Sequence, residues 1–406
     1  MGPCTGDSQP IAANATCEPI VFLGRGLAAS NIRSLLKDDP LHSRRVTALS
    51  KRPKNAPASE IDASRRVRKA KGMPSVLTVG DINADIVAVI PHYPEKGGEG
   101  LSEKGEMHGG GSAANTAIVV ARFGVGASLL ARVGTDPLGE YVFRELEKAG
   151  VDLTLVQRDP TTLTGTMFVT VMPDGERTML GHRGANVNLT SASVANIAWS
   201  DLRWVHVSGY ALLKDPQRAT ALRVFEHAVK RTMTVSLDVG MYAACQAGDE
   251  VRNLLPQASV LFQNLEEARA LTGKTQLVEA SKALLKKGVG TVVVKLGKDG
   301  CAVADGKESL RVPAFHLNVV DSTGAGDSFD AGFILGRQWG LSLRASALLG
   351  NALGGLACTV MGAGERLPKP QEALELIRRG LSDPALKSWT QELELLLKTL
   401  ERFPKT

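Results

Sequence analysis

The segment DSTGAGDSFDAGF, Asp321–Phe333, combines residue types that together suit phosphoryl transfer. Gly324, Ala325 and Gly326 are small and precede the apolar periodicity of a helix. Their backbone N–H groups would therefore be free at a helix N-terminus, where the helix dipole also favours an anion. Asp327 lies in the first turn, where a carboxylate can have the purely structural role of stabilising the helix through its dipole. Beside an anion cradle, however, a carboxylate can take the proton of an alcohol while the cradle holds the transferred group.

Two further segments have spacings that suit a site for phosphates and small polar molecules. The glycine-rich run HGGGSAANTA, His108–Ala117, leads into a predicted helix. The segment NLEE, Asn264–Glu267, has the spacing of a capping box, with Asn264 at the start of a helix and Glu267 as its third residue. Capping and a role near phosphates are both open for this pair, because phosphates also bind at helix N-termini.

In this order and spacing, the three segments resemble the signatures of the phosphofructokinase-B (PfkB), or ribokinase-like, carbohydrate kinase family, over about residues 76–380. The resemblance implies an α/β fold, a three-layer α/β/α sandwich with a mostly parallel central sheet and a small β lid. It also implies an ATP-dependent sugar kinase. Such an enzyme transfers the γ-phosphoryl group of Mg·ATP to a hydroxyl of a ribose-like sugar or a hexose.

The resemblance also implies the roles of the catalytic residues. Asp327 is the expected general base, and the amides of Gly324, Ala325 and Gly326 are the expected anion hole. Mg²⁺ is expected near Asn264 and Glu267, through water, since this ion keeps much of its hydration shell.

Further binding residues follow from the same resemblance. A monovalent cation, K⁺ in many members of the family, is expected at Asp321 and Thr323, together with backbone carbonyls near residues 359–364. The residues expected to bind ATP are Asn264, Lys295, Gly297, Gly326 and Asn351. The residues expected to bind the acceptor are Asn83, Asp85, Gly110, Gly111, Asn115 and Asp327. Carboxylates and amides suit a polyol because each can bind adjacent hydroxyls.

Other functions remain as alternatives. A nucleoside (adenosine-like) kinase of the same family would need an apolar platform for a purine, for which Tyr93, Met167 and Phe168 are candidates. A sugar-binding regulator that has lost turnover is a second alternative, against which the intact Asp327 argues. The segment DVGMYA, Asp238–Ala243, has no Arg, which makes a phosphorylated or keto-acid acceptor a poorer fit to the family pattern.

Apolar runs and amphipathic stretches alternate along the chain, which indicates a parallel sheet with helices on both faces. Two extended segments, about 86–108 and 164–183, interrupt this alternation and predict the lid. Strands are predicted at 76–80, 128–133, 204–208, 233–238, 258–262 and 290–296. Helices are predicted at 112–124, 136–149, 216–230, 264–272, 276–287, 325–339, 343–360 and 370–380.

The resemblance implies a kinase domain at 73–385. The composition of residues 1–72 suggests a basic, disordered N-terminal extension, and the apolar spacing near the C-terminus suggests a helical extension at 386–406. The net charge of +6 invites a nucleic-acid interpretation, but residues 1–72 carry 13 basic and 6 acidic residues. The remainder therefore has a net charge of −1, and aromatic residues make up only 4% of the chain. We expect no nucleic-acid or membrane partner, and a homodimer formed through the lid. The expected location is cytoplasmic, with organelle targeting by residues 1–72 left open.

Three patterns resemble other motifs. GRGLAA, Gly24–Ala29, matches a dinucleotide loop but lacks the acidic residue that should follow about twenty positions on. ARALTGKT, Ala268–Thr275, matches a loose phosphate-binding loop, although Gly273 is better interpreted as the end of a helix. The uncharged stretch 345–364 contains five glycines and is interpreted as a buried helix.

Overall fold

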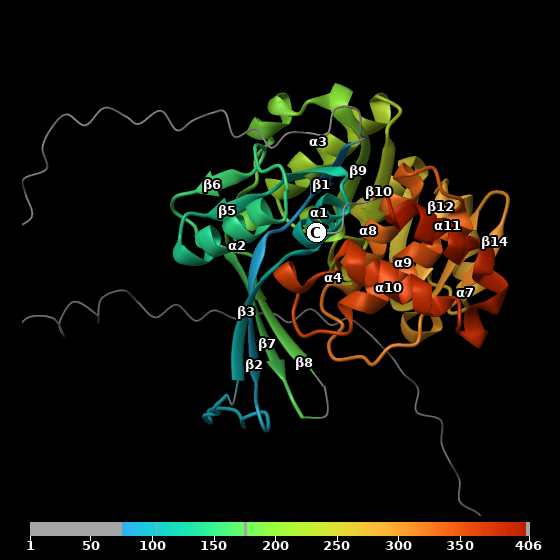
Figure 1. The fold of residues 1–406 in the computed structure, drawn as a ribbon. Helices are drawn as coiled ribbons and strands as arrows, with labels where there is room; N and C mark the ends of the chain where they lie inside the picture. The colour runs from blue at the N-terminus through green and yellow to red at the C-terminus, as the bar shows by residue number, and fades with distance from the viewer. Residues whose placement is uncertain (1–74, 103, 174–176, 403–406) are drawn as a thin grey trace, which may run out of the picture. The chain divides into compact units, whose positions relative to one another are not determined.

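The computed structural model describes residues 75–402, except 103 and 174–176. The predicted extension at 1–72, with the pattern at Gly24–Ala29, lies outside these residues. Within them, the central element is an eight-stranded sheet of order β14-β13-β12-β11-β10-β9-β1-β4 (Figure 1). Its strands are β1 Ser75–Val79, β4 Gly126–Leu130, β9 Leu202–Ser208, β10 Thr234–Asp238, β11 Val260–Asn264, β12 Thr291–Lys295, β13 Cys301–Asp305 and β14 Ser309–Val312.

In this sheet β4, β1, β9, β10, β11 and β12 are parallel neighbours, whereas β13 runs antiparallel to both of its neighbours, β12 and β14. Alternate residues of these strands enter two separate hydrophobic cores. In β11, for example, Val260 and Phe262 face one core and Leu261 faces the other. Because successive side chains of a strand point to opposite faces, a sheet covered on both sides must bury both sets.

Helices cover the two faces and complete three layers, as the α/β/α expectation requires (Figure 1). The core that contains Phe262 is closed by α1 Ser112–Arg122, α2 Pro137–Lys148, α8 Ala325–Gln338, α9 Leu343–Ala357, α10 Pro370–Gly380 and α11 Thr390–Leu400. The core that contains Leu261 is closed by α3 Gln217–Lys230, α4 Met241–Gln246, α5 Gly248–Leu254, α6 Leu265–Thr272 and α7 Leu277–Lys286.

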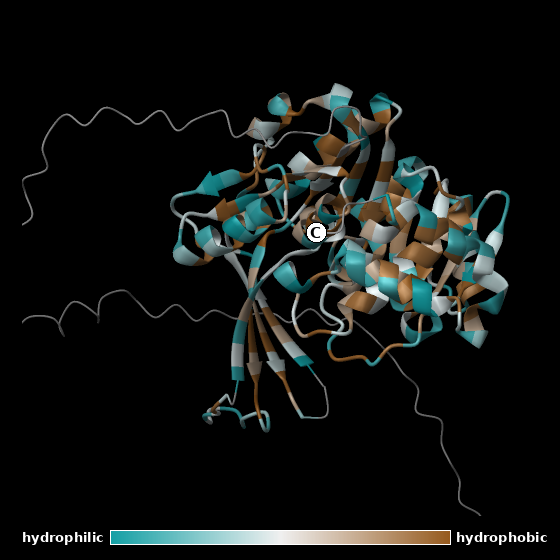
Figure 2. Ribbon diagram, in the orientation of Figure 1, coloured by the Kyte–Doolittle hydropathy of each residue, from teal (hydrophilic) through white to brown (hydrophobic). Residues whose placement is uncertain are grey.

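A second, four-stranded sheet of order β3-β2-β7-β8 extends from one side of this body and forms the lid (Figure 1). Its strands are β2 Asn83–Val89, β3 Lys104–Gly110, β7 Gly165–Val171 and β8 Arg177–His182, and a separate small pair is formed by β5 Arg132–Gly134 and β6 Gln157–Asp159. Strand β2 follows β1 after only three residues, so a short connection joins the lid to the central sheet. Hydrophobic residues lie along the lid strands as well as in the body (Figure 2).

Two of the motif interpretations are tested by the helices. Gly273 adopts a left-handed conformation (φ 69°) and ends α6, with its N–H donated to the carbonyl of Arg269, so the helix-end interpretation is confirmed. The uncharged stretch 345–364 lies largely in α9, a buried helix of 15 residues. None of the helices in the described residues is long and apolar enough to cross a membrane.

Candidate active site

Three polar side chains lie at the carboxyl ends of neighbouring parallel strands. Asp238 ends β10, Asn264 ends β11 and Lys295 ends β12, with Asn264 and Lys295 directly paired. In parallel sheets this edge gathers the functional side chains, because all the strands point towards it. The N-terminus of α8 lies at the same edge, since a Cβ placed on Gly326 would lie 3.3 Å from the Lys295 ammonium.

The glycine loop before α8 adopts a left-handed conformation at Gly324. Gly324 has φ 73°, which glycine alone adopts without strain, and a Cβ there would lie 2.9 Å from Leu367. The amide of Ala325 already donates to the carbonyl of Ser322 at 3.2 Å, a long bond within the loop. Of the three amides expected to form the anion hole, that of Ala325 therefore has an internal partner at the start of the helix.

Asp327 lies in the first turn of α8 and is bound by the helix of the glycine-rich segment. The amide Nδ2 of Asn115, in α1, donates to Asp327 Oδ2 at 2.8 Å. Burial raises the pKa of Asp327, and the nearby Asp238 carboxylate raises it further, whereas the Asn115 hydrogen bond lowers it. The structure thus joins two predicted site residues that are 212 positions apart.

The residues expected to bind the acceptor meet where the lid joins the body. Asn83 and Asp85 belong to the first lid strand, β2, which starts three residues before the predicted lid boundary. Strand β3 pairs Gly110 with Asn83, and a Cβ on Gly110 would lie 2.2 Å from an Asp85 carboxylate oxygen. Gly111 has φ 97° and approaches the carbonyl of Asp81 too closely for any side chain. Gly110 therefore leaves the space that the Asp85 carboxylate occupies, and Gly111 allows the close approach to the backbone of Asp81.

Unpartnered oxygen atoms face this junction. Asp85 Oδ1 and Asn115 Oδ1 are buried and have no hydrogen-bond partner within the described part of the chain. Burial raises the pKa of Asp85 to about 7, and the charges of Asp327 and Asp321 add to the shift. Buried acceptors without partners are costly unless a ligand supplies donors, and hydroxyl groups are suitable donors.

A buried cluster of charges surrounds Lys295, and sequence analysis did not find its other members. Lys295 Nζ donates to Asp238 Oδ1 at 2.8 Å and to Asp330 Oδ1 at 3.2 Å. Burial alone would lower the pKa of Lys295, but Asp238 and Asp330 raise it well above its ordinary value, so the ammonium stays charged. The spacing of Asp330, three residues after Asp327 on one helix, is a signal that could have identified it.

Asn264 and Glu267 form the predicted capping box. Asn264 Oδ1 accepts from the Glu267 amide at 2.9 Å, and Glu267 Oε2 accepts from the Asn264 amide at 2.8 Å. The capping interpretation is therefore confirmed, while each carboxylate oxygen keeps a lone pair for a water molecule. No group of three or more His, Cys, Asp or Glu side chains suited to a metal ion occurs among the described residues.

The remaining predicted residues lie around this edge with different partners. Asn351, in α9, donates its amide to the carbonyls of Val312 and Pro313, so it holds the chain after β14. Gly297 follows β12 with φ 58°. Asp321 and Thr323 both accept hydrogen bonds from Arg177 of the lid, a residue that sequence analysis did not single out.

A second missed cluster fixes the base of the lid. Arg183, just beyond β8, makes a two-pronged ion pair with Asp81, at 2.8 and 3.1 Å, and Gln217 of α3 donates to the same carboxylate at 2.7 Å. Asn186 donates to Asn83 Oδ1 at 2.8 Å. These contacts hold the start of β2, and with it Asp85, at a defined place over the body.

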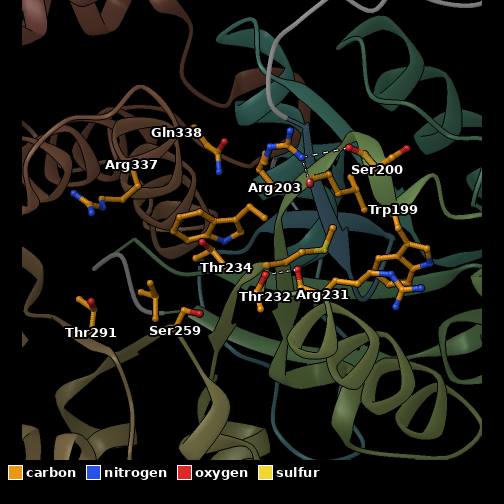
Figure 3. A pocket seen from close by; sticks show the side chains of 14 residues that line it. Trp199, Ser200, Arg203, Arg231, Thr232, Thr234, Ser259, Thr291, Arg337 and Gln338 are labelled. Carbon is orange, nitrogen blue, oxygen red and sulfur yellow. Dashed lines mark hydrogen bonds between the residues drawn. The ribbon is translucent and has the colours of Figure 1, made fainter.

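A pocket of about 780 Å³ lies at the other end of the central sheet, lined by Trp204, Thr234, Ser259 and Thr291 near the starts of β9 to β12 (Figure 3). Its arginines, Arg203, Arg231 and Arg337, point in different directions (Figure 3). It contains none of the predicted site residues and is separate from the carboxyl edge.

Comparisons with known proteins show the family to which the chain is similar. The sequence model of the pfkB family of carbohydrate kinases matches residues 73–370 of this chain. A ribokinase of Haemophilus influenzae is 28% identical, covering 75% of this chain and 99% of that protein. A fructokinase of Escherichia coli is 31% identical, covering 70% and 95%. The structure of Arabidopsis thaliana ribokinase complexed with ribose and ATP is 27% identical, with a TM-score of 0.64, covering 75% and 99%.

Proposed function

Because the chain belongs to the pfkB family of carbohydrate kinases, and is thus an ATP-dependent phosphotransferase with an alcohol acceptor, we propose that its carboxyl-edge site phosphorylates a small sugar. The acceptor class is a ribose-like sugar or a hexose. The observation that carries this proposal is the Asp327–Asn115 pair at the N-terminus of α8, beside the buried, unpartnered oxygen of Asp85.

Asp327 is the proposed general base. Its raised pKa makes the carboxylate a better proton acceptor than an exposed aspartate, and the Asn115 amide orients it. The acceptor hydroxyl would give its proton to Asp327 as its oxygen attacks the γ-phosphorus of ATP. The bond to the ADP oxygen breaks in the same transfer.

The amides of residues 324–326 are the proposed anion hole for the transferred group, with the ammonium of Lys295 beside Gly326. Asp238 and Asp330 hold that ammonium in place and keep it charged. Asn264, Gly297 and Asn351 are proposed to lie along the nucleotide.

Mg²⁺ is the proposed cofactor, and it would neutralise charge on the β- and γ-phosphates when bound with ATP. Glu267 and Asn264 would contact its water shell, because their own oxygen atoms already take part in the capping box. This arrangement agrees with an ion bound mainly by phosphate and water.

The chemistry of the acceptor pocket favours a sugar over a nucleoside. Asp85 Oδ1 and Asn115 Oδ1 offer acceptors for hydroxyl groups. Of the residues considered as a platform for a purine, Phe168 is paired with Ile86, so it faces the side of the lid opposite to Asp85. Met167 is paired with Asp85 and lies on the same face of the lid, so it is the better placed of these two side chains to contact a purine.

A homodimer through the lid is part of the same proposal. Met107, Ile86, Phe168 and Leu180 are cross-strand partners and form one row over the outer face of the lid, which we call the outer row. Met107, Phe168 and Leu180 are 38%, 48% and 60% exposed. A contiguous exposed apolar patch of this kind marks an interaction surface.

ADP release with a panel of acceptors tests the proposed function. Ribose, other pentoses, fructose, glucose, adenosine and cytidine would each be supplied with Mg·ATP. We expect a free sugar to give the highest kcat/KM, by about tenfold or more over each nucleoside. An acceptor that leaves the buried oxygens of Asp85 and Asn115 without hydrogen bonds should react more slowly. Preference for a nucleoside would contradict the acceptor class. Thermal stabilisation by a sugar without ADP release would instead indicate a regulator.

A further inference from the structure

Arg177 links the lid to the loop that precedes the anion hole. It is the first residue of β8, the edge strand of the lid sheet. Its Nη1 donates to Asp321 Oδ1 at 2.5 Å and to Thr323 Oγ1 at 2.9 Å, and its Nη2 donates to Ser322 Oγ at 2.5 Å. One guanidinium group thus binds three consecutive residues that end directly before Gly324.

The same loop is fixed from the body side. Asp321 Oδ2 accepts from the amide of Gly362 at 2.8 Å, and the Asp321 amide donates to the carbonyl of Cys358. Asp321 Oδ1 also accepts from the amide of Thr323 at 3.0 Å. With Arg177 added, both carboxylate oxygens of Asp321 are engaged, and its side chain is only 7% exposed.

These contacts bear on the monovalent cation expected at Asp321 and Thr323. The side-chain oxygens of Asp321 and Thr323, which would be ligands of that ion, both accept hydrogen bonds from the guanidinium of Arg177. A free ion at these oxygens would lie against a fixed positive charge, which costs electrostatic energy in a partly buried place. These side-chain oxygens therefore have the arginine as their cationic partner and are not free for an added K⁺ ion beside it.

We propose that Arg177 is a positioning residue that serves as a built-in monovalent cation, holding the Asp321–Thr323 loop so that the amides of residues 324–326 face the transferred phosphoryl group. The proposal rests on the proposed function, because it concerns the same anion hole. It makes the kinase independent of added monovalent cations. It also makes the position of the anion hole depend on the docking of β8 against the body.

The decisive experiment compares the wild-type protein with Arg177→Met in K⁺, Na⁺ and choline buffers. Turnover is measured with the best acceptor of the panel, and binding of a non-hydrolysable ATP analogue is measured by calorimetry in the same buffers. Arg311→Met is a matched control, since Arg311 is an exposed arginine in the edge strand β14. Thermal unfolding shows whether each variant is folded.

We expect wild-type turnover and ATP-analogue affinity to change less than about twofold among the three buffers. Arg177→Met should lose about ten- to a hundredfold in kcat/KM in choline, because a small misplacement of binding groups has effects of this size. K⁺ should restore part of that loss and part of the ATP-analogue affinity, because the freed oxygens of Asp321 and Thr323 can then take the ion. Arg311→Met should behave as the wild type.

Three results would overturn the proposal. The first is a wild-type protein that requires K⁺ for turnover. The second is an Arg177→Met variant with the same kcat/KM as the wild type in choline. The third is a loss of kcat/KM in that variant that K⁺ does not relieve, which would indicate a merely structural contact. The calorimetric measurement keeps this test apart from the proposed function. If no acceptor in the panel gives ADP release, the proposed function fails, while the cation dependence of ATP-analogue binding still tests the role of Arg177.

Discussion

Burial and two neighbouring charges raise the pKa of Asp85, an acceptor-site carboxyl, to about 7. If the ionised form accepts hydrogen bonds from two sugar hydroxyls, acceptor affinity should rise with pH. We predict that the acceptor Kd in the absence of ATP falls about tenfold between pH 6 and 8. Calorimetric titration at several pH values measures this.

The Asp85→Asn variant provides the control for that prediction. It should bind the acceptor weakly and with a flat pH profile. The folded-state pKa of Asp85 is raised, so its contribution to stability is present below about pH 4 and is lost as pH rises through 7. The difference in Tm between the variant and the ligand-free wild type should therefore grow in favour of the variant over this range. An unchanged pH profile of binding in Asp85→Asn would contradict the assignment.

At the same scale, the sequence identifies residues with strong local signals and misses those defined by tertiary contacts. The Gly324–Asp327 loop and the capping box at Asn264 are local patterns, and they were predictable for that reason. Arg177 and Asp238 gain their significance only from partners 144 and 57 positions away, Asp321 and Lys295. A pattern within one segment carries no information about such pairs.

At the scale of elements, the hydrophobic periodicity predicts long helices and buried strands well. Helix α9, for example, was predicted at 343–360 and spans Leu343–Ala357. The short elements α4, α5, β13 and β14 were missed, because four to seven residues provide too few turns or alternations to be distinguished from loops. The lid strand β2 begins before its predicted boundary, which places Asn83 and Asp85 on the lid itself.

Helix α11 provides a prediction about stability. Leu396 is fully buried in the core that α11 shares with α9 and α10, whereas Leu395 is 42% exposed. We expect Leu396→Ala to lower the free energy of unfolding by about 2–5 kcal/mol, through lost burial and a cavity. Leu395→Ala on the same helix should change it by less than about 0.5 kcal/mol. Urea unfolding of the two variants measures the difference, and equal midpoints would show that α11 is not part of the core.

At the scale of the whole molecule, the outer row of the lid predicts how copies of the chain associate. We expect a dimer at micromolar concentration in sedimentation velocity. Phe168→Glu should weaken it by about thirtyfold or more, corresponding to ~2 kcal/mol for a central interface residue. Val278→Glu is a matched control, because Val278 is 60% exposed on α7, outside the lid. A monomeric wild type, or a dimer that survives Phe168→Glu, would contradict this prediction.

The central claim is that Asp327 is the general base of a sugar kinase, and turnover of Asp327→Asn with the best acceptor tests it most directly. The account predicts a fall in kcat of about 10²–10⁴, the usual contribution of a general base, with the ATP affinity unchanged within about twofold. Asp249→Asn, which alters an exposed aspartate in the first turn of α5, should keep full turnover. Turnover of Asp327→Asn within a few-fold of the wild type would contradict the account.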